Sequence, residues 1–369
     1  MAEPVVFDVE GLQALIDAAA AEGRTVVGPT LREGAVVHDT ITSTADLPRG
    51  VHDEQDAGRY RTTTTDDPGF FGYAAGPQSW KPWVFPGREL LRSSGRQPVP
   101  SGVPPSLLLL GVRSCDLTAL GVLDRVLQGR PAVDSAYVAR RAAVLVVAVT
   151  CETPAGTCFC VSTDSGPAPR AGYDLALTEL VGGVDGHRFV ARAGTDEGER
   201  LLAAVPTWAA TRADLDEETS LVDRAESNMG RSLQTQGLRD VLHANPESPV
   251  WDEVADRCLS CGNCTLVCPT CFCTSVDDVA SLTDDAQRWR VWDSCFSTDH
   301  SYVHGGPVRS GTKPRYRQWA THKLASWWDQ FGTSGCVGCG RCITWCPVAI
   351  DLTEEVGRIQ ADAARDAEV

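Results

Sequence analysis

One cysteine spacing, C-x2-C-x2-C-x3-C-P, occurs twice in the C-terminal third of this chain. Its cysteines are Cys258, Cys261, Cys264 and Cys268 in the first copy, and Cys336, Cys339, Cys342 and Cys346 in the second. Three thiols at this spacing are arranged around one face of a compact metal centre, and Gly262 and Gly340 let the backbone turn close to it. The fourth cysteine begins an outgoing segment and points away from the other three.

This spacing is that of ferredoxins with two 4Fe–4S clusters, in which the fourth cysteine of each run ligates the other cluster. The sequence therefore predicts a first cluster on Cys258, Cys261, Cys264 and Cys346. It predicts a second cluster on Cys336, Cys339, Cys342 and Cys268. Because each cluster is tied to both motifs, we expect the two to lie close together, with residues 274–335 inserted between the motifs. The alternative is zinc, but zinc ribbons usually split their ligands into separated pairs.

The chain has 15 cysteines, and its first residues lack the basic start and apolar core of a secretory signal. No apolar run is long enough to span a bilayer. We therefore expect a cytoplasmic protein, in which metal ligation explains the cysteines better than disulfides do. The formal net charge of −16 argues against general affinity for nucleic acid or anionic membranes, so we expect neither as a partner.

The first half of the chain, residues 1–210, is predicted to be an α/β domain. Its clearest unit is an apolar run at residues 106–112, a helical period over 116–127 and a second apolar run at 142–149. Two continuous apolar strands around a helix indicate a parallel β-α-β crossover. The rest of the chain is predicted to be a helical connecting arm, residues 211–250, and a mainly helical ferredoxin-like domain with two 4Fe–4S clusters, residues 251–369.

Four further cysteines lie near the ends of the predicted strands. Cys115 follows the first apolar strand, Cys151 follows the second, and Cys158 and Cys160 are in the loop after it. Ligands gather at the carboxyl ends of strands in an open parallel sheet. We therefore predict a third 4Fe–4S cluster on these thiols; the alternative is that they are buried apolar thiols without a metal.

The string Thr-Cys-Phe-Cys occurs twice, and its second copy places Cys271 and Cys273 directly after the first cluster motif, with Cys295 further along. Three thiols cannot complete a cubane by themselves. A further cluster here would need an Asp, a His or a shared cysteine as its fourth ligand. The alternative is that these thiols line the surroundings of the second cluster.

Residues 300–328 contain no Asp or Glu but several basic residues: Arg309, Lys313, Arg315, Arg317 and Lys323. This stretch is a docking face for a partner, a compensation of cluster charge, or a solvated helix. His300 and His304 are four residues apart, and we expect a structural role for them. The sequence has neither a phosphate loop nor a dinucleotide fingerprint, so we expect no NAD(P), no flavin and no catalytic residue on this chain.

The combined pattern resembles the β (iron–sulfur) subunit of cytoplasmic sulfhydrogenases, the NAD(P)-linked nickel–iron hydrogenases, and the related A subunit of anaerobic sulfite reductase. The more specific strings are GVRSCDLTALGVLD and VTCETPAGTCFCVS in the first half and CLSCGNCTLVCPTCFCTS near the first cluster motif. The second motif, in GTSGCVGCGRCITWCPVAIDLTEEV, adds to the resemblance, whereas residues 1–75 contribute little.

The resemblance implies an electron-transfer subunit between two other subunits. A flavin and 2Fe–2S subunit would exchange electrons with NAD(P)H, and the hydrogenase small and large subunits would exchange them at the nickel–iron centre. Delivery to a sirohaem sulfite reductase subunit is the alternative in the same class. A redox-sensing iron–sulfur protein is the alternative of a different class, but the paired, crossed motifs favour electron transfer.

Overall fold

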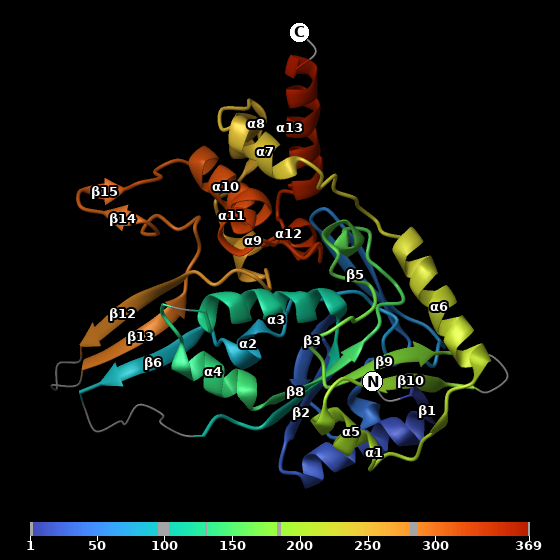
Figure 1. Cartoon of the computed structure of the whole chain (residues 1–369). Coiled ribbons are helices and arrows are strands. Elements are labelled where there is room, and N and C mark those ends of the chain that lie inside the picture. Colours follow the sequence, from blue (N-terminus) through green and yellow to red (C-terminus); the bar gives the residue numbers. More distant parts are fainter. Residues whose placement is uncertain (1–2, 95–102, 130, 183–185, 281–285, 368–369) are drawn as a thin grey trace.

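The computed structural model describes residues 3–94, 103–129, 131–182, 186–280 and 286–367. The N-terminal half is built on an eight-stranded sheet with helices on both faces (Figure 1). Its strands in spatial order are β11 (Trp208–Ala209), β1 (Val5–Asp8), β10 (Arg188–Ala193), β9 (Leu175–Leu180), β8 (Val144–Val149), β7 (Leu107–Val112), β2 (Thr25–Arg32) and β3 (Ala35–Thr40).

The central strands β2, β7, β8 and β9 are parallel to one another, whereas the outer strands pair antiparallel. Every residue of β7 and β8 is buried because helices cover both faces of the sheet. Leu108 enters the core beneath α1 (Val9–Ala21), and Leu109 enters the core beneath α3 (Ser114–Leu127). The predicted parallel crossover is confirmed as β7–α3–β8.

Three short helices complete the layers on this half: α2 (Lys81–Val84), α4 (Ser135–Ala142) and α5 (Asp196–Leu202). Between the halves come α6 (Arg212–Ser227) and α7 (Leu238–Ala244). Helix α6 packs on the sheet: its Leu221 is buried against residues of β9 and β10, and its Asp214 accepts a hydrogen bond from Arg188 at 2.7 Å. Helix α7 packs on the C-terminal half through Leu238 and Leu242.

The C-terminal half has its own core around Trp251, Tyr316 and Trp319. Its helices lie above α3 in Figure 1. They are α8 (Val250–Arg257), α9 (Asn263–Leu266), α10 (Thr312–Thr321), α11 (Trp327–Phe331), α12 (Arg341–Thr344) and α13 (Leu352–Ala367), with a π-helical turn (His322–Ser326) between α10 and α11.

The expected mainly helical character of residues 251–369 is not confirmed, because this region is mixed α and β. The insertion between the motifs contains β12 (Thr274–Ala280) and β13 (Ala286–Trp292), which pair with β6 (Arg88–Ser93) from the other half of the chain. This three-stranded sheet projects from the molecule (Figure 1), followed by the short pair β14 (Tyr302–Val303) and β15 (Gly306–Pro307). The β13 sequence alternates polar and large apolar residues, which suits a strand covered on one face.

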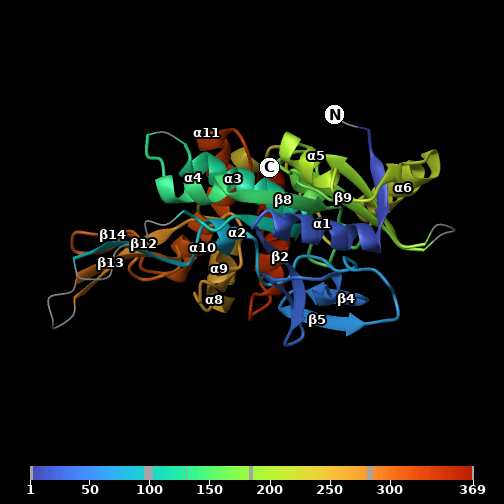
Figure 2. The ribbon, with the colours of Figure 1, turned by 90° about the horizontal axis from the view of Figure 1, so that it is seen from below.

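A hairpin of β4 (Val51–Asp56) and β5 (Arg59–Thr64) lies apart from the large sheet, as Figure 2 shows, and supports the second cysteine motif. The Gly58 amide donates to the Ile343 carbonyl at 3.1 Å, and the Thr344 hydroxyl donates to Gln55 Oε1 at 2.8 Å. Among the described residues, no helix has both the length and the apolar character that crossing a membrane requires.

Candidate iron–sulfur sites

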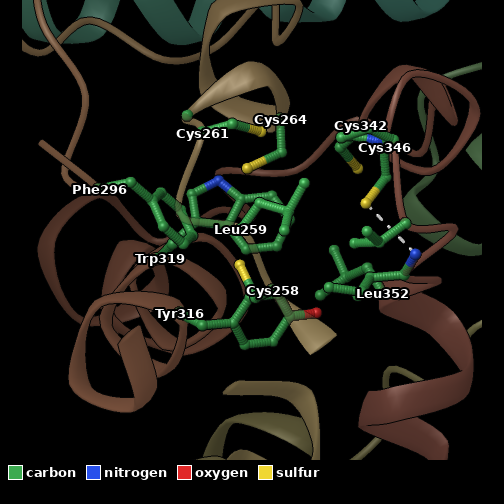
Figure 3. A pocket seen from close by; sticks show the side chains of 14 residues that line it. Cys258, Leu259, Cys261, Cys264, Phe296, Tyr316, Trp319, Cys342, Cys346 and Leu352 are labelled. Carbon is green, nitrogen blue, oxygen red and sulfur yellow. Dashed lines mark hydrogen bonds between the residues drawn. The ribbon is translucent and has the colours of Figure 1, made fainter. Parts of the chain in front are cut away.

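The first cavity gathers five thiols from the two cysteine motifs. It is lined by Cys258, Cys261, Cys264 and Cys346, which are the cysteines predicted for the first cluster, and also by Cys342. Figure 3 shows these side chains around one space. The remaining wall is apolar and aromatic, formed by Leu259, Phe296, Tyr316, Trp319, Val348, Ile350 and Leu352.

Local backbone geometry directs the thiols of this first cavity. Cys258 ends α8, and the next turn contains Ser260 and Gly262 at φ values of 51° and 73° before α9 begins. The Ser260 amide lies 3.4 Å from Cys258 Sγ, and the Ile350 amide lies 3.3 Å from Cys346 Sγ (the dashed line in Figure 3). Amide hydrogen bonds to ligating sulfur tune the reduction potential of a cluster.

Burial shifts the pKa of two of these thiols, Cys264 and Cys258. It raises the pKa of Cys264 well above the ordinary value, and the charges of Cys295 and Cys258 raise it further. Burial also raises the pKa of Cys258. Thiols of this kind lose their protons to iron when a metal centre binds, because the thiolate is the ligand. The four predicted ligands line one apolar space and fit a 4Fe–4S cluster, whose ligands are four cysteine thiolates.

The second set of thiols lies immediately beside the first cavity. Burial is the main cause that raises the pKa of Cys342 well above its ordinary value. The nearby negative charges of Cys336, Cys339 and Cys268 raise it further. The structure therefore brings the second motif together with the last cysteine of the first motif. Because Cys342 also lines the first cavity, the two sets share a wall.

Two buried lysines face the second set. Lys323 donates to Cys268 Sγ at 3.2 Å and to Thr270 Oγ1 at 2.9 Å. Lys81 donates to the carbonyls of Cys268 and Cys271, both at 3.0 Å, and its Nζ lies 3.8 Å from the ring centroid of Trp292. Both lysines are at most 5% exposed. Fixed positive charge here offsets the negative charge of thiolate ligands.

The other basic residues of 300–328 have their own partners. Lys313 donates to Asp252 and Glu247, and Arg317 pairs with Glu247. Arg315 is buried and donates to the carbonyls of Phe296 and Ser297. Compensation of cluster charge therefore fits Lys323, whereas Lys313 and Arg317 hold the helices of the C-terminal half together.

The third cavity contains the four cysteines predicted for the third cluster. Cys115 lies in the first turn of α3, directly after β7, and Cys151 follows β8. Cys158 and Cys160 come from the next loop, and all four line one cavity with Arg113 and Cys339. Burial raises the pKa of Cys115 and Cys158 well above the ordinary value, as at the first cavity. The structure thus collects a complete four-thiol set here.

The third cavity touches the second motif through the backbone. The Phe159 amide donates to the Gly338 carbonyl at 2.8 Å, and the Ser165 hydroxyl donates to the Val337 carbonyl at 2.7 Å. Gly338 has φ +59°, and a Cβ there would lie 2.5 Å from the Phe159 carbonyl oxygen. Only glycine allows this approach and this backbone conformation together.

A buried ion pair lies between the third cavity and the second set. Arg341 donates to both carboxylate oxygens of Asp116 at 2.9 and 2.8 Å, and to the carbonyls of Gly76 and Gln78. Arg113 is also buried and donates to the carbonyls of Thr150, Phe71 and Tyr73. Both guanidinium groups therefore have fixed positions beside the third cavity.

The remaining three cysteines line a fourth cavity. Cys271, Cys273 and Cys295, predicted as extra ligands, lie there with His300 and His322. His304 is not among the lining residues and is exposed.

Comparison with known proteins identifies a dicluster domain in the C-terminal half of the chain. A family model described as a 4Fe-4S dicluster domain matches residues 257–350, which include all eight motif cysteines. The sulfhydrogenase 2 subunit beta of Pyrococcus furiosus is 35% identical over 261 residues, covering 69% of this chain and 74% of that protein. This chain belongs to the sulfhydrogenase beta subunit family. No solved structure matches it.

The spacing of the thiols in this sulfhydrogenase beta subunit family member also argues against zinc. In the described part of the chain, no three His, Cys, Asp or Glu side chains are close enough to hold a single metal ion. A single zinc needs its thiolates about 2.3 Å away on all sides, whereas a cubane keeps its thiolates further apart. The dicluster domain supports two 4Fe–4S clusters in this region.

Of the buried cations near the thiols, Lys323 was identified from the sequence, but the others were missed. Arg341 stands inside the second motif, between Cys339 and Cys342, where a charged residue is a visible signal. Arg113 comes two residues before Cys115. Lys81 lies far from every motif in sequence, so only the fold reveals it.

Proposed function

We propose that this chain is the iron–sulfur electron-transfer subunit of a sulfhydrogenase-type complex. The clusters supply one-electron transfer when they are bound. Cys258, Cys261, Cys264 and Cys346 would hold the first, and Cys336, Cys339, Cys342 and Cys268 the second. Cys115, Cys151, Cys158 and Cys160 would hold a third.

The observation that carries this proposal is the continuity of the thiol-lined sites. Cys342 lines the first cavity while belonging to the second set, and Cys339 lines the third cavity while belonging to the second set. Three sites that share walls in this way support a continuous path across the molecule. The protein fixes the spacing of these sites and surrounds them with buried charged side chains.

The two ends of this path suggest where partners dock. The first cavity reaches the surface, because Cys261 is exposed and Leu259 is 64% exposed. An exposed apolar side chain beside a metal centre suits the interface of a partner that exchanges electrons there. We propose a flavin and 2Fe–2S subunit that oxidises NAD(P)H and the hydrogenase small and large subunits as the partners. We propose a cytoplasmic location for the complex, as the sequence predicts.

The test is to purify the complex from its native source through a tag on this chain and to identify its subunits. We expect co-purified hydrogenase subunits and hydrogen-dependent reduction of NAD(P)+. Co-purification of a sirohaem subunit, with sulfite reduction and no hydrogen uptake, would overturn the hydrogenase assignment. A complex in which the clusters are lost reversibly and never re-oxidised by a partner would support a redox sensor instead.

A further inference from the structure

The fourth cavity combines three thiols with two imidazoles. It is lined by Cys271, Cys273, Cys295, His300 and His322, together with Lys323. The proposed electron-transfer function uses none of these thiols or imidazoles, so the cavity needs an explanation of its own.

Strand pairing brings the thiols of this cavity together. Cys271 and Cys273 lie in the segment that enters β12, and Cys295 lies in the segment that leaves β13. The Asp293 amide donates to the Cys273 carbonyl at 2.9 Å, directly after the Thr274–Trp292 pair of the two strands. Sequence-distant thiols are therefore held at the same end of one hairpin.

A π-helical turn forms the opposite side of this cavity. It spans His322–Ser326 and includes Lys323. Such turns inside α-helices are rare and are found frequently at functional sites, because they redirect side chains. Here the turn places His322 at the cavity and Lys323 Nζ 3.2 Å from Cys268 Sγ.

Both imidazoles of the cavity have a nitrogen available for a metal. His300 Nδ1 lies 3.4 Å from Asp293 Oδ2, and its Nε2 makes no hydrogen bond to the described residues. Metal-ligating histidines usually have a carboxylate at the other ring nitrogen. The His322 ring packs at an angle against Phe272 and Trp327 and makes no hydrogen bond to the described residues.

We propose that this cavity binds a fourth 4Fe–4S cluster through Cys271, Cys273, Cys295 and one imidazole nitrogen. A cubane suits the site better than a single ion, because no three of its possible ligands in the described residues are close enough for one ion. Histidine ligates a metal as a neutral imidazole, so the site would carry one negative charge fewer than four thiolates would give. A lower negative charge reduces repulsion with the neighbouring second set of thiolates, where Lys323 and Lys81 already supply positive charge.

The first measurement is the iron content of anaerobically purified full-length protein and of single variants. We expect Cys273→Ser and Cys295→Ser each to lose about four irons and about four sulfides per chain relative to the wild type. Cys158→Ser should lose a separate group of about four, and a double variant with Cys273→Ser should lose about eight. An unchanged iron content in both Cys273→Ser and Cys295→Ser would overturn the proposal, whatever Cys158→Ser shows.

The second measurement needs no cysteine variant, so it stands even where a variant fails to fold. Pulsed EPR of the reduced wild-type protein labelled with 15N-histidine should show a strongly coupled imidazole nitrogen on one cluster. His300→Ala or His322→Ala should abolish that coupling, and whichever does so identifies the ligand. His304→Ala is the matched control and should retain it. Absence of a coupled nitrogen in the wild type would overturn the proposed ligand set.

Discussion

The first and third cavities are each lined by their four predicted ligands and by one cysteine of the second set, but their surroundings differ. The first has an apolar and aromatic wall, includes the exposed Cys261, and is lined by no lysine or arginine in the described part of the chain. The third has mostly buried cysteines, has Arg113 in its wall, and has Arg341 nearby on Asp116.

This difference separates two roles for the residues around a metal centre. Around the first cavity, exposed side chains such as Leu259 are available to a partner. Around the third cavity and the second set, buried cations hold the two halves of the chain together and favour the more negative, reduced form of a cluster. Substitutions should therefore affect folding and reduction potential at the interior sites, and partner binding at the surface site.

The largest effect is expected from Arg341→Ala. Removing the guanidinium leaves the Asp116 carboxylate buried without its partner, which typically costs about 3–5 kcal/mol of stability. Urea unfolding under anaerobic conditions measures this loss. Arg365→Ala is the control, because its pair with Asp362 on α13 is exposed and should contribute less than about 1 kcal/mol. Equal losses in the two variants would contradict the interior role of Arg341.

Gly338→Ala tests the contact between the halves. The new Cβ would meet the Phe159 carbonyl oxygen at 2.5 Å in a backbone conformation at φ +59°. We expect a loss of about 1–3 kcal/mol in the free energy of unfolding. Gly357→Ala in α13 has open space around its Cβ and should be neutral or stabilising by up to about 1 kcal/mol. A stable Gly338→Ala variant would show that the two loops are not held in contact.

The pH dependence of stability reports the burial of His38 near Arg341. Burial, and then the charge of Arg341, lower the pKa of His38 from 6.5 to about 3. The unfolded chain binds a proton there below pH 6.5 and the folded chain does not until about pH 3, so this contribution to stability is lost as the pH falls through that window. The expected loss is about 1.4 kcal/mol per pH unit within the window.

His38→Gln removes this titration and is the comparison for it. Unfolding free energies of both proteins at pH 7, 6 and 5 should diverge, with the variant changing less. Parallel curves would show that His38 is not held neutral by its surroundings.

Lys323→Met tests the charge beside the second set. Loss of the ammonium group 3.2 Å from Cys268 Sγ should make the nearest cluster harder to reduce. A shift of about 60 mV to more negative potential corresponds to a loss of about 1.4 kcal/mol for one electron. A redox titration followed by EPR measures it, with Lys313→Met as control because that lysine pairs at the surface. An equal shift in both variants would indicate a general charge effect.

The smallest effect on stability is expected from Leu259→Ser. This side chain is 64% exposed, so the free energy of unfolding should change by less than about 0.5 kcal/mol. Recovery of the partner subunits from the native complex should nevertheless fall. Leu91→Ser, 41% exposed on β6, is the control. Full recovery with Leu259→Ser would place the partner elsewhere.

Local spacing explains what could be predicted from the sequence. The cysteine runs at 258–268 and 336–346 define their own turns, and the apolar runs of β7 and β8 define the buried crossover. Their strand ends then place Cys115 and Cys151 at one edge, where the structure gathers them with Cys158 and Cys160. These inferences need only short-range patterns and one topological rule.

Long-range pairing explains what could not be predicted. The alternation in β13 is a visible strand signal, but its partner β6 lies in the other half of the chain. The contacts of Lys81 with the Cys268 and Cys271 carbonyls likewise join residues far apart in sequence. The prediction that residues 251–369 are mainly helical missed this sheet, because tertiary pairing decides whether such a segment becomes a strand.

The place of Cys339 in the wall of the third cavity has a consequence for assembly. Cys115, Cys151, Cys158 and Cys160 leave the ribosome long before the segment that closes their cavity. The third cavity is therefore completed only when the last part of the chain folds back, a late, high-contact-order step. The proposed third cluster would have to be delivered before that step closes the interface between the two halves.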